Sequence, residues 1–266
     1  MTIEATRPPE RARLRVAAAQ FAASEDPASN LRRVDEAAAL AAEAGASLLA
    51  CPEATMARFG TDLATVAEPL DGRFADGLRD VATRHVLTVV AGMFEPAGDG
   101  RVFNTLLLTG GDGEVSYRKI HLYDAFGARE SDSVAPGTKL ATATVAGVRV
   151  GLATCYDLRF ADQFTALGRA GAELIVTPAS WGEGAGKAEQ WDLLTRARAM
   201  DAQAYLLACD QAWVPPRGAQ PLGIGRSVLT DPLGRLCARL GHEAGLLVGD
   251  VDSALVTRIR RDVPIL

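Results

Sequence analysis

Apolar residues gather into short runs that recur in the two halves of the chain. Residues 14–20 (LRVAAAQ) and 148–154 (VRVGLAT) are apolar segments of strand length. Residues 44–52 (AGASLLACP) and 170–178 (AGAELIVTP) match almost position by position, and each predicts a helix end stopped by glycine, followed by a strand that ends at proline. Both strands are apolar throughout, as is typical of a sheet covered on both faces.

The repeat extends to the helices and hairpins of each half. Further pairs of segments share a pattern, more weakly: 31–43 with 164–170, 86–94 with 204–210, and 107–113 with 228–234. The first pair has the apolar spacing of helices, and the last pair ends in hairpin turns. The pattern in each half therefore predicts the same order of elements: strand, helix, strand, helix, strand and hairpin. Two such sheets with outer helices predict an α/β fold, a four-layer αββα sandwich of two mixed β-sheets with an internal pseudo-two-fold repeat.

The composition is that of a globular protein. No proline- or serine-rich linker separates the halves, so we expect a single domain over residues 14–266, preceded by a flexible tail over residues 1–13 that lacks the apolar core of a signal peptide. The 266 residues are 48% hydrophobic and 23% charged, and a chain of this length buries a core without disulfides or structural metal. Without a secretion signal we expect a cytoplasmic protein whose four cysteines are free thiols.

Several classes of partner and cofactor are disfavoured. The net charge is −5 and no basic run is present, which argues against nucleic acid, and no apolar stretch reaches the roughly 18 residues of a membrane span. The three histidines lack the close Cys/His spacing of a zinc site, so we expect no metal. Residues 182–187 lack the P-loop pattern and residues 223–225 are only a fragment of a dinucleotide fingerprint, so we expect no cofactor.

Three side chains able to do chemistry follow predicted strands. Cys155 follows the first strand of the second half, Glu53 follows the second strand of the first half, and Lys119 lies in the hairpin that ends the first half. Ligand sites in open α/β sheets lie beyond the carboxyl ends of strands, where these positions are able to converge.

The three residue types suit attack on a carbonyl group. A thiol has a pKa of about 8.5, so a nearby Lys119 ammonium would populate its thiolate and stabilise the oxyanion formed on attack. Glu53 would move the protons. The backbone N–H of Tyr156 would be a second oxyanion donor if a helix begins there.

The sequence around these residues is similar to three signatures of the nitrilase, or carbon–nitrogen hydrolase, superfamily. They are CPEA at residues 51–54, YRKIHLY at 117–123 and CYDLRF at 155–160, in the family's order of Glu, Lys and Cys. The resemblance spans nearly the whole chain, and three motifs in order are far more specific than one. It implies an αββα sandwich, usually paired into dimers, that hydrolyses amides or nitriles without a cofactor. We therefore expect a homodimer or a higher even oligomer. It also implies a further glutamate after the lysine motif; Glu130 fills that place and would orient Lys119.

Within the superfamily, the run after Cys155 resembles the amidase branch that includes omega-amidases and deaminated-glutathione amidases. The resemblance implies hydrolysis of a small omega-type amide through a Cys155 thioester, with release of ammonia. Branch members commonly have Pro-Glu where this chain has Ala161-Asp162, which leaves the substrate geometry beside the nucleophile open. From their closeness to the motifs, we expect four residues to line the substrate pocket: Met56, Phe59, Phe126 and Trp181.

For the other cysteines and for the polar residues near the motifs, a structural role is favoured over a chemical one. Three further cysteines are interpreted as small buried hydrophobes: Cys51, Cys209 and Cys237. Arg159 and Asp157 flank the nucleophile, and a structural ion pair between them is favoured over substrate contact. His121 lies two residues from Lys119 and is expected to make a structural hydrogen bond rather than a Cys–His dyad.

Four alternatives to an omega-amidase stay in view. A nitrilase or an N-carbamoyl amidase would use the same fold and the same three residues. A glutaminase-type ammonia supplier would need a synthetase partner, and no ligase domain is present in this chain. A non-catalytic binding protein is disfavoured, because it would have no chemical reason to keep Glu53, Lys119 and Cys155 together.

Overall fold

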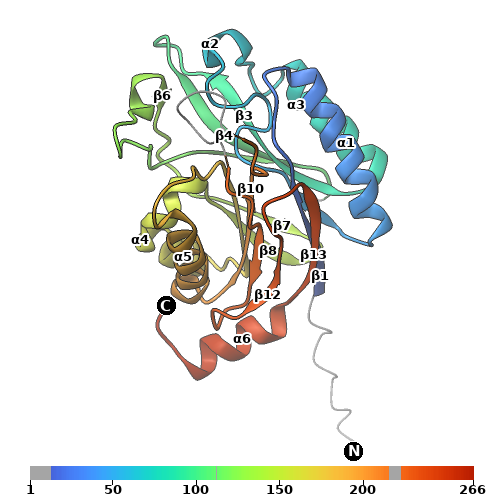
Figure 1. The fold of residues 1–266 in the computed structure, drawn as a ribbon. Helices are drawn as coiled ribbons and strands as arrows, with labels where there is room; N and C mark the ends of the chain where they lie inside the picture. The colour runs from blue at the N-terminus through green and yellow to red at the C-terminus, as the bar shows by residue number, and fades with distance from the viewer. Residues whose placement is uncertain (1–12, 112, 216–222) are drawn as a thin grey trace, which may run out of the picture.

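Two β-sheets pack face to face in the computed structural model, which describes residues 13–111, 113–215 and 223–266 (Figure 1). The first sheet has the order β13-β1-β2-β3-β4-β5, with β6 beside β4. Its strands are β1 (Arg13–Gln20), β2 (Leu48–Ala50), β3 (Thr88–Pro96), β4 (Val102–Thr109), β5 (Val115–Arg118), β6 (Val134–Ala135) and β13 (Gly245–Asp252). The central strands β1, β2 and β3 pair parallel with one another; β13 with β1, β4 with β3 and β5 with β4 pair antiparallel, and β6 pairs parallel with β4.

The second sheet repeats this pattern in the order β12-β11-β10-β9-β8-β7. Its strands are β7 (Ala141–Val145), β8 (Val148–Leu152), β9 (Leu174–Ala179), β10 (Tyr205–Asp210), β11 (Val228–Thr230) and β12 (Leu236–Arg239). Again the three central strands are parallel and the others antiparallel. The predicted αββα sandwich of two mixed sheets with an internal repeat is therefore confirmed.

One feature of the strand order does not follow from the repeat. β7 comes after the first half of the chain yet pairs with β8 in the second sheet, and β13 comes after the second half yet pairs with β1 in the first sheet. The two halves thus exchange their last strands. Sequence similarity between the halves does not reveal this, because the partner of an outer strand is a tertiary choice.

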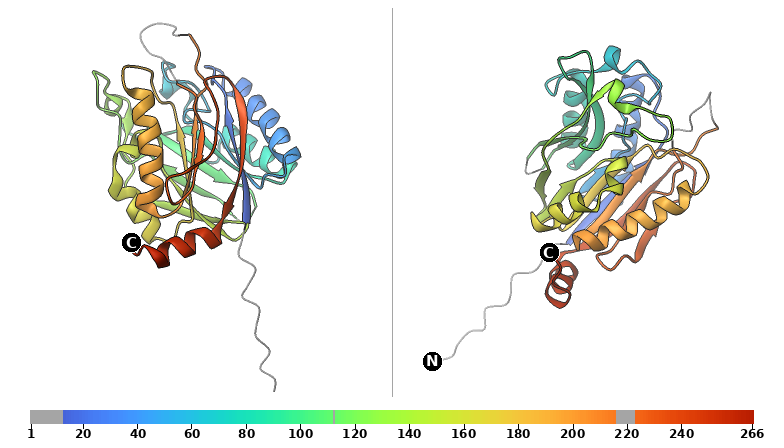
Figure 2. Two further views of the ribbon diagram at one scale, coloured as in Figure 1. Left: turned by 60° about the horizontal axis from the view of Figure 1, so that its bottom comes forward. Right: turned by 90° about the vertical axis from the view of Figure 1, so that its left-hand side faces the viewer.

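Helices cover the outer face of each sheet (Figures 1 and 2). Their bounds are α1 (Pro27–Glu43), α2 (Leu63–Val66), α3 (Arg73–His85), α4 (Ala161–Arg169), α5 (Lys187–Ala202) and α6 (Ser253–Asp262). α1 and α3 pack on the first sheet, and α4 and α5 on the second. α1 begins earlier than the predicted 31–43, because the Asp26 carboxylate accepts from the backbone N–H groups of Ala28 and Ser29 and Pro27 fits the first helical turn.

The core lies in three slabs between the four layers. Alternate residues of β1 show how one strand serves two of them, since successive side chains point to opposite faces of a sheet. Ala17 and Ala19 pack against the helices, whereas Val16 and Ala18 pack against the other sheet. Because the sheets stack in this way, segments that leave strands of different sheets meet at one end of the sandwich.

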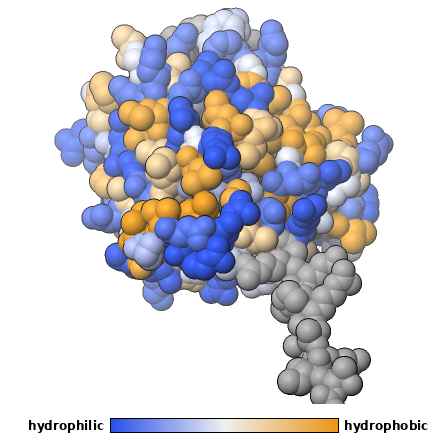
Figure 3. Space-filling view, turned by 90° about the horizontal axis from the view of Figure 1, so that it is seen from below, coloured by the Kyte–Doolittle hydropathy of each residue, from blue (hydrophilic) through white to orange (hydrophobic). Residues whose placement is uncertain are grey.

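The remaining features of the fold are its surface and the ends of the chain. The face over α6 carries apolar side chains in several places between charged ones (Figure 3). Within the described ranges, no helix is long and apolar enough to cross a membrane. The predicted tail over residues 1–13 lies outside the described residues, apart from Arg13, which is the first residue of β1.

Candidate active site

Four polar side chains from separate segments converge on one cavity of about 670 Å³. Glu53 follows β2, and Lys119 directly follows β5 in the same sheet. Cys155 follows β8 of the second sheet and begins the short helix η2 (Cys155–Arg159), and Glu130 begins the short helix η1 (Glu130–Asp132). The cavity therefore lies where the two sheets present the ends of their strands.

Lys119 lies between two carboxylates. Its Nζ is 2.9 Å from Oε1 of Glu53 and 2.9 Å from Oε2 of Glu130. Lys119 and Glu53 are almost fully buried. Burial opposes the charge on Lys119, but attraction to Glu130, Glu53 and Cys155 outweighs it, so the pKa of the ammonium is raised well above its ordinary value. Lys119 is thus a fixed cation in the cavity wall.

Glu53 has further partners that sequence reasoning missed. The Asn104 amide nitrogen donates to Glu53 Oε1 at 2.8 Å and to Glu130 Oε1 at 3.2 Å, while the backbone N–H of Ser180 donates to Glu53 Oε2 at 2.8 Å. The Gln211 amide nitrogen holds the backbone carbonyl of Glu53 at 2.7 Å. A signal for Asn104 existed in the sequence: it is an amide in the mostly apolar strand β4, where a buried amide needs partners.

Cys155 sits at a sharp turn with its thiol largely enclosed. Its φ of 46° is in the left-handed region that side chains other than glycine rarely adopt, which marks a constrained position. Burial and the neighbouring Glu53 carboxylate raise the pKa of the Cys155 thiol well above its ordinary value, and Lys119 lowers it only in part. These directions do not favour a resting thiolate, because the Lys119 ammonium is also shared with two carboxylates.

Glu53 is the carboxylate in this cavity that is placed to accept the proton of the Cys155 thiol. The Cys155 thiol and the Glu53 carboxylate line the same cavity, so attack on a carbonyl carbon coupled to proton transfer onto Glu53 needs no free thiolate in the resting protein. The chain does turn into a helix at Cys155, as the oxyanion assignment of Tyr156 required. The first N–H groups of a helix have no acceptor within it, so the Tyr156 N–H suits an oxyanion.

The predicted pocket residues separate into two groups. Phe59, Phe126 and Trp181 line the cavity. Met56 does not: it is fully buried in the core between the first sheet and its helices, where its sulfur accepts from the backbone N–H of Phe94. Met56 follows Glu53 by only three residues, but the backbone bond from its N–H to the Gly92 carbonyl directs this segment back into the core.

Two cations in the cavity wall lack carboxylate partners among the described residues. The expected ion pair between Arg159 and Asp157 is wrong: Arg159 donates to the Gln190 amide oxygen at 2.7 Å, and its Nε is buried without an acceptor among the described residues. Lys187 is 9% exposed, and its Nζ lies 3.1 Å from the Tyr123 hydroxyl and 4.1 Å from the centre of the Phe126 ring. An enclosed cation without a counter-ion indicates a place for an anionic group.

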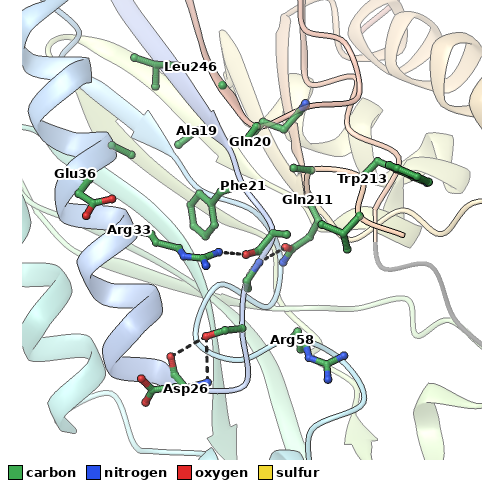
Figure 4. A pocket seen from close by; sticks show the side chains of 18 of the residues that line it. Ala19, Gln20, Phe21, Asp26, Arg33, Glu36, Arg58, Gln211, Trp213 and Leu246 are labelled. Atoms are coloured by element: carbon green, nitrogen blue, oxygen red, sulfur yellow. Dashed lines mark hydrogen bonds between the residues drawn. The ribbon is translucent and has the colours of Figure 1, made fainter. Parts of the chain in front are cut away.

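A larger cavity of about 1140 Å³ lies next to this one, between the β1–α1 connection, α1 and residues 211–215 (Figure 4). Gln211 borders it and joins the two regions, since its amide oxygen accepts from Ala23 while its amide nitrogen holds Glu53. No cysteine lines this cavity. Its Arg58 is paired with Glu25. The described residues of the larger cavity thus include no thiol, and the smaller one, which holds Cys155 beside Glu53 and Lys119, is the candidate active site.

The remaining cysteines and possible metal ligands are apart from this chemistry. Cys51 and Cys209 are fully buried, but Cys237 is exposed on β12, so its interpretation as a buried hydrophobe is wrong: it lies on a short edge strand facing solvent. Among the described residues, no group of three or more His, Cys, Asp or Glu side chains is arranged to hold a metal ion.

Comparison with known proteins gives a consistent result. Residues 15–261 match the family model described as carbon-nitrogen hydrolase. The chain is 48% identical over 264 residues to a hydrolase of Mycobacterium tuberculosis, which covers 95% of this chain and 94% of that protein. It is 36% identical over 256 residues to the deaminated glutathione amidase of Escherichia coli O157:H7, covering 94% and 95%. It is 32% identical over 260 residues to the omega-amidase of Mus musculus, covering 95% and 93%.

The fold is likewise shared with a solved structure. The crystal structure of Nit3 from Saccharomyces cerevisiae, described as a member of branch 10 of the nitrilase superfamily, superimposes with a TM-score of 0.84. The two chains are 25% identical, and the match covers 95% of each.

Proposed function

The chain belongs to the carbon–nitrogen hydrolase family, and from this premise we propose that it hydrolyses a small omega-type amide through a Cys155 thioester and releases ammonia. Hydrolysis of non-peptide carbon–nitrogen bonds is its general class, since its relatives are named amidases. The observation that carries the proposal is the buried cluster of Glu53, Lys119 and Glu130 beside Cys155 in one cavity.

The first half of the reaction forms the thioester. Cys155 Sγ attacks the amide carbonyl carbon while its proton passes to Glu53, and the carbonyl oxygen becomes an oxyanion near Lys119 and the Tyr156 N–H. Protonated Glu53 then gives that proton to the amide nitrogen. The carbon–nitrogen bond breaks, ammonia leaves, and the acyl group stays on Cys155. Glu130 keeps Lys119 in place through this step.

The second half returns the free enzyme. Glu53 takes a proton from a water molecule, whose oxygen attacks the thioester carbonyl carbon. The same donors face the new oxyanion. The carbon–sulfur bond breaks, the sulfur of Cys155 regains its proton from Glu53, and the carboxylic acid product departs. One carboxylate thus serves as base and acid in both halves.

Replacing the nucleophile tests the proposal. In Cys155→Ala we expect ammonia release from a good amide substrate to fall by a factor on the order of 1,000 or more, because no thioester forms. Circular dichroism should match the wild type, since alanine fills a similar volume. Cys237→Ala is the matched control, and it should keep full activity because Cys237 lies exposed on β12. More than residual turnover by Cys155→Ala would refute the nucleophile assignment.

Arg159 and Lys187 support a substrate that carries a carboxylate at the end opposite its amide. Both line the cavity with Cys155, and neither is paired with a described carboxylate. A carboxylate of the substrate would supply the missing counter-ion. Relatives are named omega-amidase and deaminated glutathione amidase. We therefore propose a monoamide of a short dicarboxylic acid as the substrate class.

Other reactions of the same cavity are distinguishable. A nitrile would form a thioimidate on Cys155, whose nitrogen needs protonation and hydration before ammonia leaves. An N-carbamoyl substrate would release carbon dioxide as well as ammonia, and a glutaminase-type supplier would act on glutamine. A screen of one side chain carried as amide, nitrile and carbamoyl compound, with ammonia as readout, ranks them. Wild-type protein that turns over none of them would favour a binding role.

A homodimer, or a higher even oligomer, is part of the same proposal. It is supported by family membership alone. Light scattering at micromolar concentration tests it, and a monomeric mass there would count against it.

A further inference from the structure

Asp157 is a buried carboxylate that the reaction steps above do not use. It is fully buried two residues after Cys155. Its Oδ2 accepts from the Tyr117 hydroxyl at 2.6 Å and from the Thr154 N–H at 2.8 Å. Its Oδ1 lies 2.8 Å from His121 Nδ1 and 3.1 Å from the His121 N–H. A carboxylate only accepts, so His121 Nδ1 carries the hydrogen.

The four donors belong to the two segments that carry catalytic groups. Tyr117 and His121 stand two residues before and two residues after Lys119, and Thr154 directly precedes Cys155. The Tyr117 hydroxyl also accepts from the Ile120 N–H at 3.2 Å. Asp157, which lies in the turn that carries Cys155, therefore bonds to residues on both sides of Lys119 and to the residue directly before Cys155.

Strand pairing does not fix these two segments against each other. Lys119 follows β5 at the edge of the first sheet, whereas Cys155 follows β8 in the second sheet. Hydrogen bonds within a sheet set register only among its own strands. The relative position of the two turns depends on side chains, and a second contact links the same segments: the His121 ring stacks on Phe160 with centroids 3.6 Å apart.

The cost of burying Asp157 also argues for a specific role. A buried carboxylate is tolerated only when hydrogen bonds replace its lost hydration. All four bonds to Asp157 come from within two residues of Lys119 or next to Cys155. The bond from the Thr154 N–H is the capping-box bond at the start of η2, whereas the other three come from the segment around Lys119, which no local helix geometry requires.

We propose that Asp157 is a positioning residue that holds the Lys119 turn against the Cys155 turn, so that ammonium and sulfur keep the distance that the reaction needs. It rests on the proposed function, in which Lys119 and Cys155 act on the same carbonyl. Displacement of such groups by about 1 Å costs on the order of 100-fold in rate. Asp157 touches no substrate; it acts through the two turns.

Tyr117→Phe tests this without changing charge or ring. It removes the hydrogen bond that the Tyr117 hydroxyl donates to Asp157, together with the two that this hydroxyl accepts from the Ile120 N–H and the Gln163 amide nitrogen. We expect kcat to fall about 10-fold and KM to stay within about twofold, since the substrate-binding wall is untouched. We also expect slower alkylation of Cys155 by iodoacetamide, mapped by peptide, because a displaced Lys119 lowers the thiol pKa less. Asp157→Asn places an amide NH₂ against two donors and should lower kcat about 100-fold.

Asp231→Asn is the matched control. Asp231 is also buried, and its Oδ1 accepts from the N–H groups of Leu233 and Arg235 in the β11–β12 turn. This variant should lower Tm and leave kcat and Cys155 alkylation at wild-type values. All variants are compared at a temperature where circular dichroism shows each of them folded.

The outcomes separate the positioning role from a structural one and from the proposed function. If Tyr117→Phe and Asp157→Asn behave like Asp231→Asn, losing stability alone, the positioning role is overturned. If Asp157→Asn does not fold, Tyr117→Phe decides by itself. If the wild type hydrolyses no amide, the proposed function fails, while the alkylation rate of Cys155 in Tyr117→Phe still decides whether Asp157 sets the position of Lys119.

Discussion

At the scale of single residues, the positive charge of Lys119 is already paired with two carboxylates in the cavity wall. Lys119 is shared between Glu53 and Glu130, which leaves less of its charge to lower the pKa of the Cys155 thiol. In the proposed reaction the Cys155 thiol gives its proton to Glu53 as it attacks the substrate carbonyl, so the reaction needs no resting thiolate.

Lys187 should decide how well a carboxylate-bearing amide binds. In Lys187→Met we expect KM for a dicarboxylic monoamide to rise at least about 10-fold, because a hydrogen-bonded charge pair in an enclosed site contributes about 1.5–3 kcal/mol. The neutral amide that carries a methyl in place of the carboxylate should change little. Ammonia-release kinetics on both substrates measure this difference.

Lys139→Met serves as the control for loss of one positive charge. Lys139 is exposed and is not among the residues that line the cavity. If Lys187→Met weakens both substrates equally, or neither, then Lys187 does not recognise a carboxylate and the substrate class has to be reconsidered.

At the scale of elements, β3 makes room for the segment that carries Glu53. Gly92 lies in this strand, and a Cβ added there would come within 2.6 Å of the Ala54 backbone nitrogen and 3.1 Å of the Glu53 Cα. Backbone cannot yield as a side chain does. The glycine therefore lets the Glu53 loop lie flat against the strand, where Met56 N–H bonds the Gly92 carbonyl.

Gly92→Ala should harm activity through this contact. We expect kcat/KM to fall at least about 10-fold, because the added methyl pushes Glu53 away from Lys119 and Cys155. The free energy of unfolding should fall by about 1–3 kcal/mol from overpacking. Kinetics and urea titration on the same sample separate the two effects.

Gly249→Ala in β13 is the matched comparison, since its added Cβ meets only the Leu229 side chain, which can rotate away. It should keep activity near that of the wild type. Equal losses in the two variants would mean that any crowding of the first sheet lowers the rate, and Gly92 would then have no special tie to Glu53.

At the scale of the whole molecule, the exchange of outer strands binds the halves together. β7 follows the first half and completes the second sheet, while β13 follows the second half and completes the first. Neither half would keep all the strands of its sheet if the other unfolded. We therefore propose that residues 14–266 form one cooperative domain.

Unfolding in urea should show one transition, and the tryptophans make the test direct. All three lie in the second half, at Trp181, Trp191 and Trp213. Their fluorescence reports on the second sheet and its helices, whereas far-UV circular dichroism reports on both halves. The two curves should coincide. Midpoints that differ beyond error would indicate two domains that unfold separately.

The sequence alone determined the features that depend on local pattern. Apolar runs bounded by glycine and proline gave the strands, their recurrence gave the two matched sheets, and three short motifs located Glu53, Lys119 and Cys155. The predictions of the strands and of the two sheets succeed because periodicity and turn chemistry act over a few residues, so that each segment carries its own signal.

Tertiary structure alone decided how distant segments complete one another. Gln211 donates to the Glu53 carbonyl from far along the chain, and Asn104 bridges two carboxylates. Lys187 and Arg159 face one cavity with no counter-ion among the residues that the structure describes. Asp157 bonds the segment around Lys119 to the turn at Cys155. A buried polar atom must find its partner wherever the fold brings one. That choice depends on how the two sheets stack, which no stretch of sequence contains.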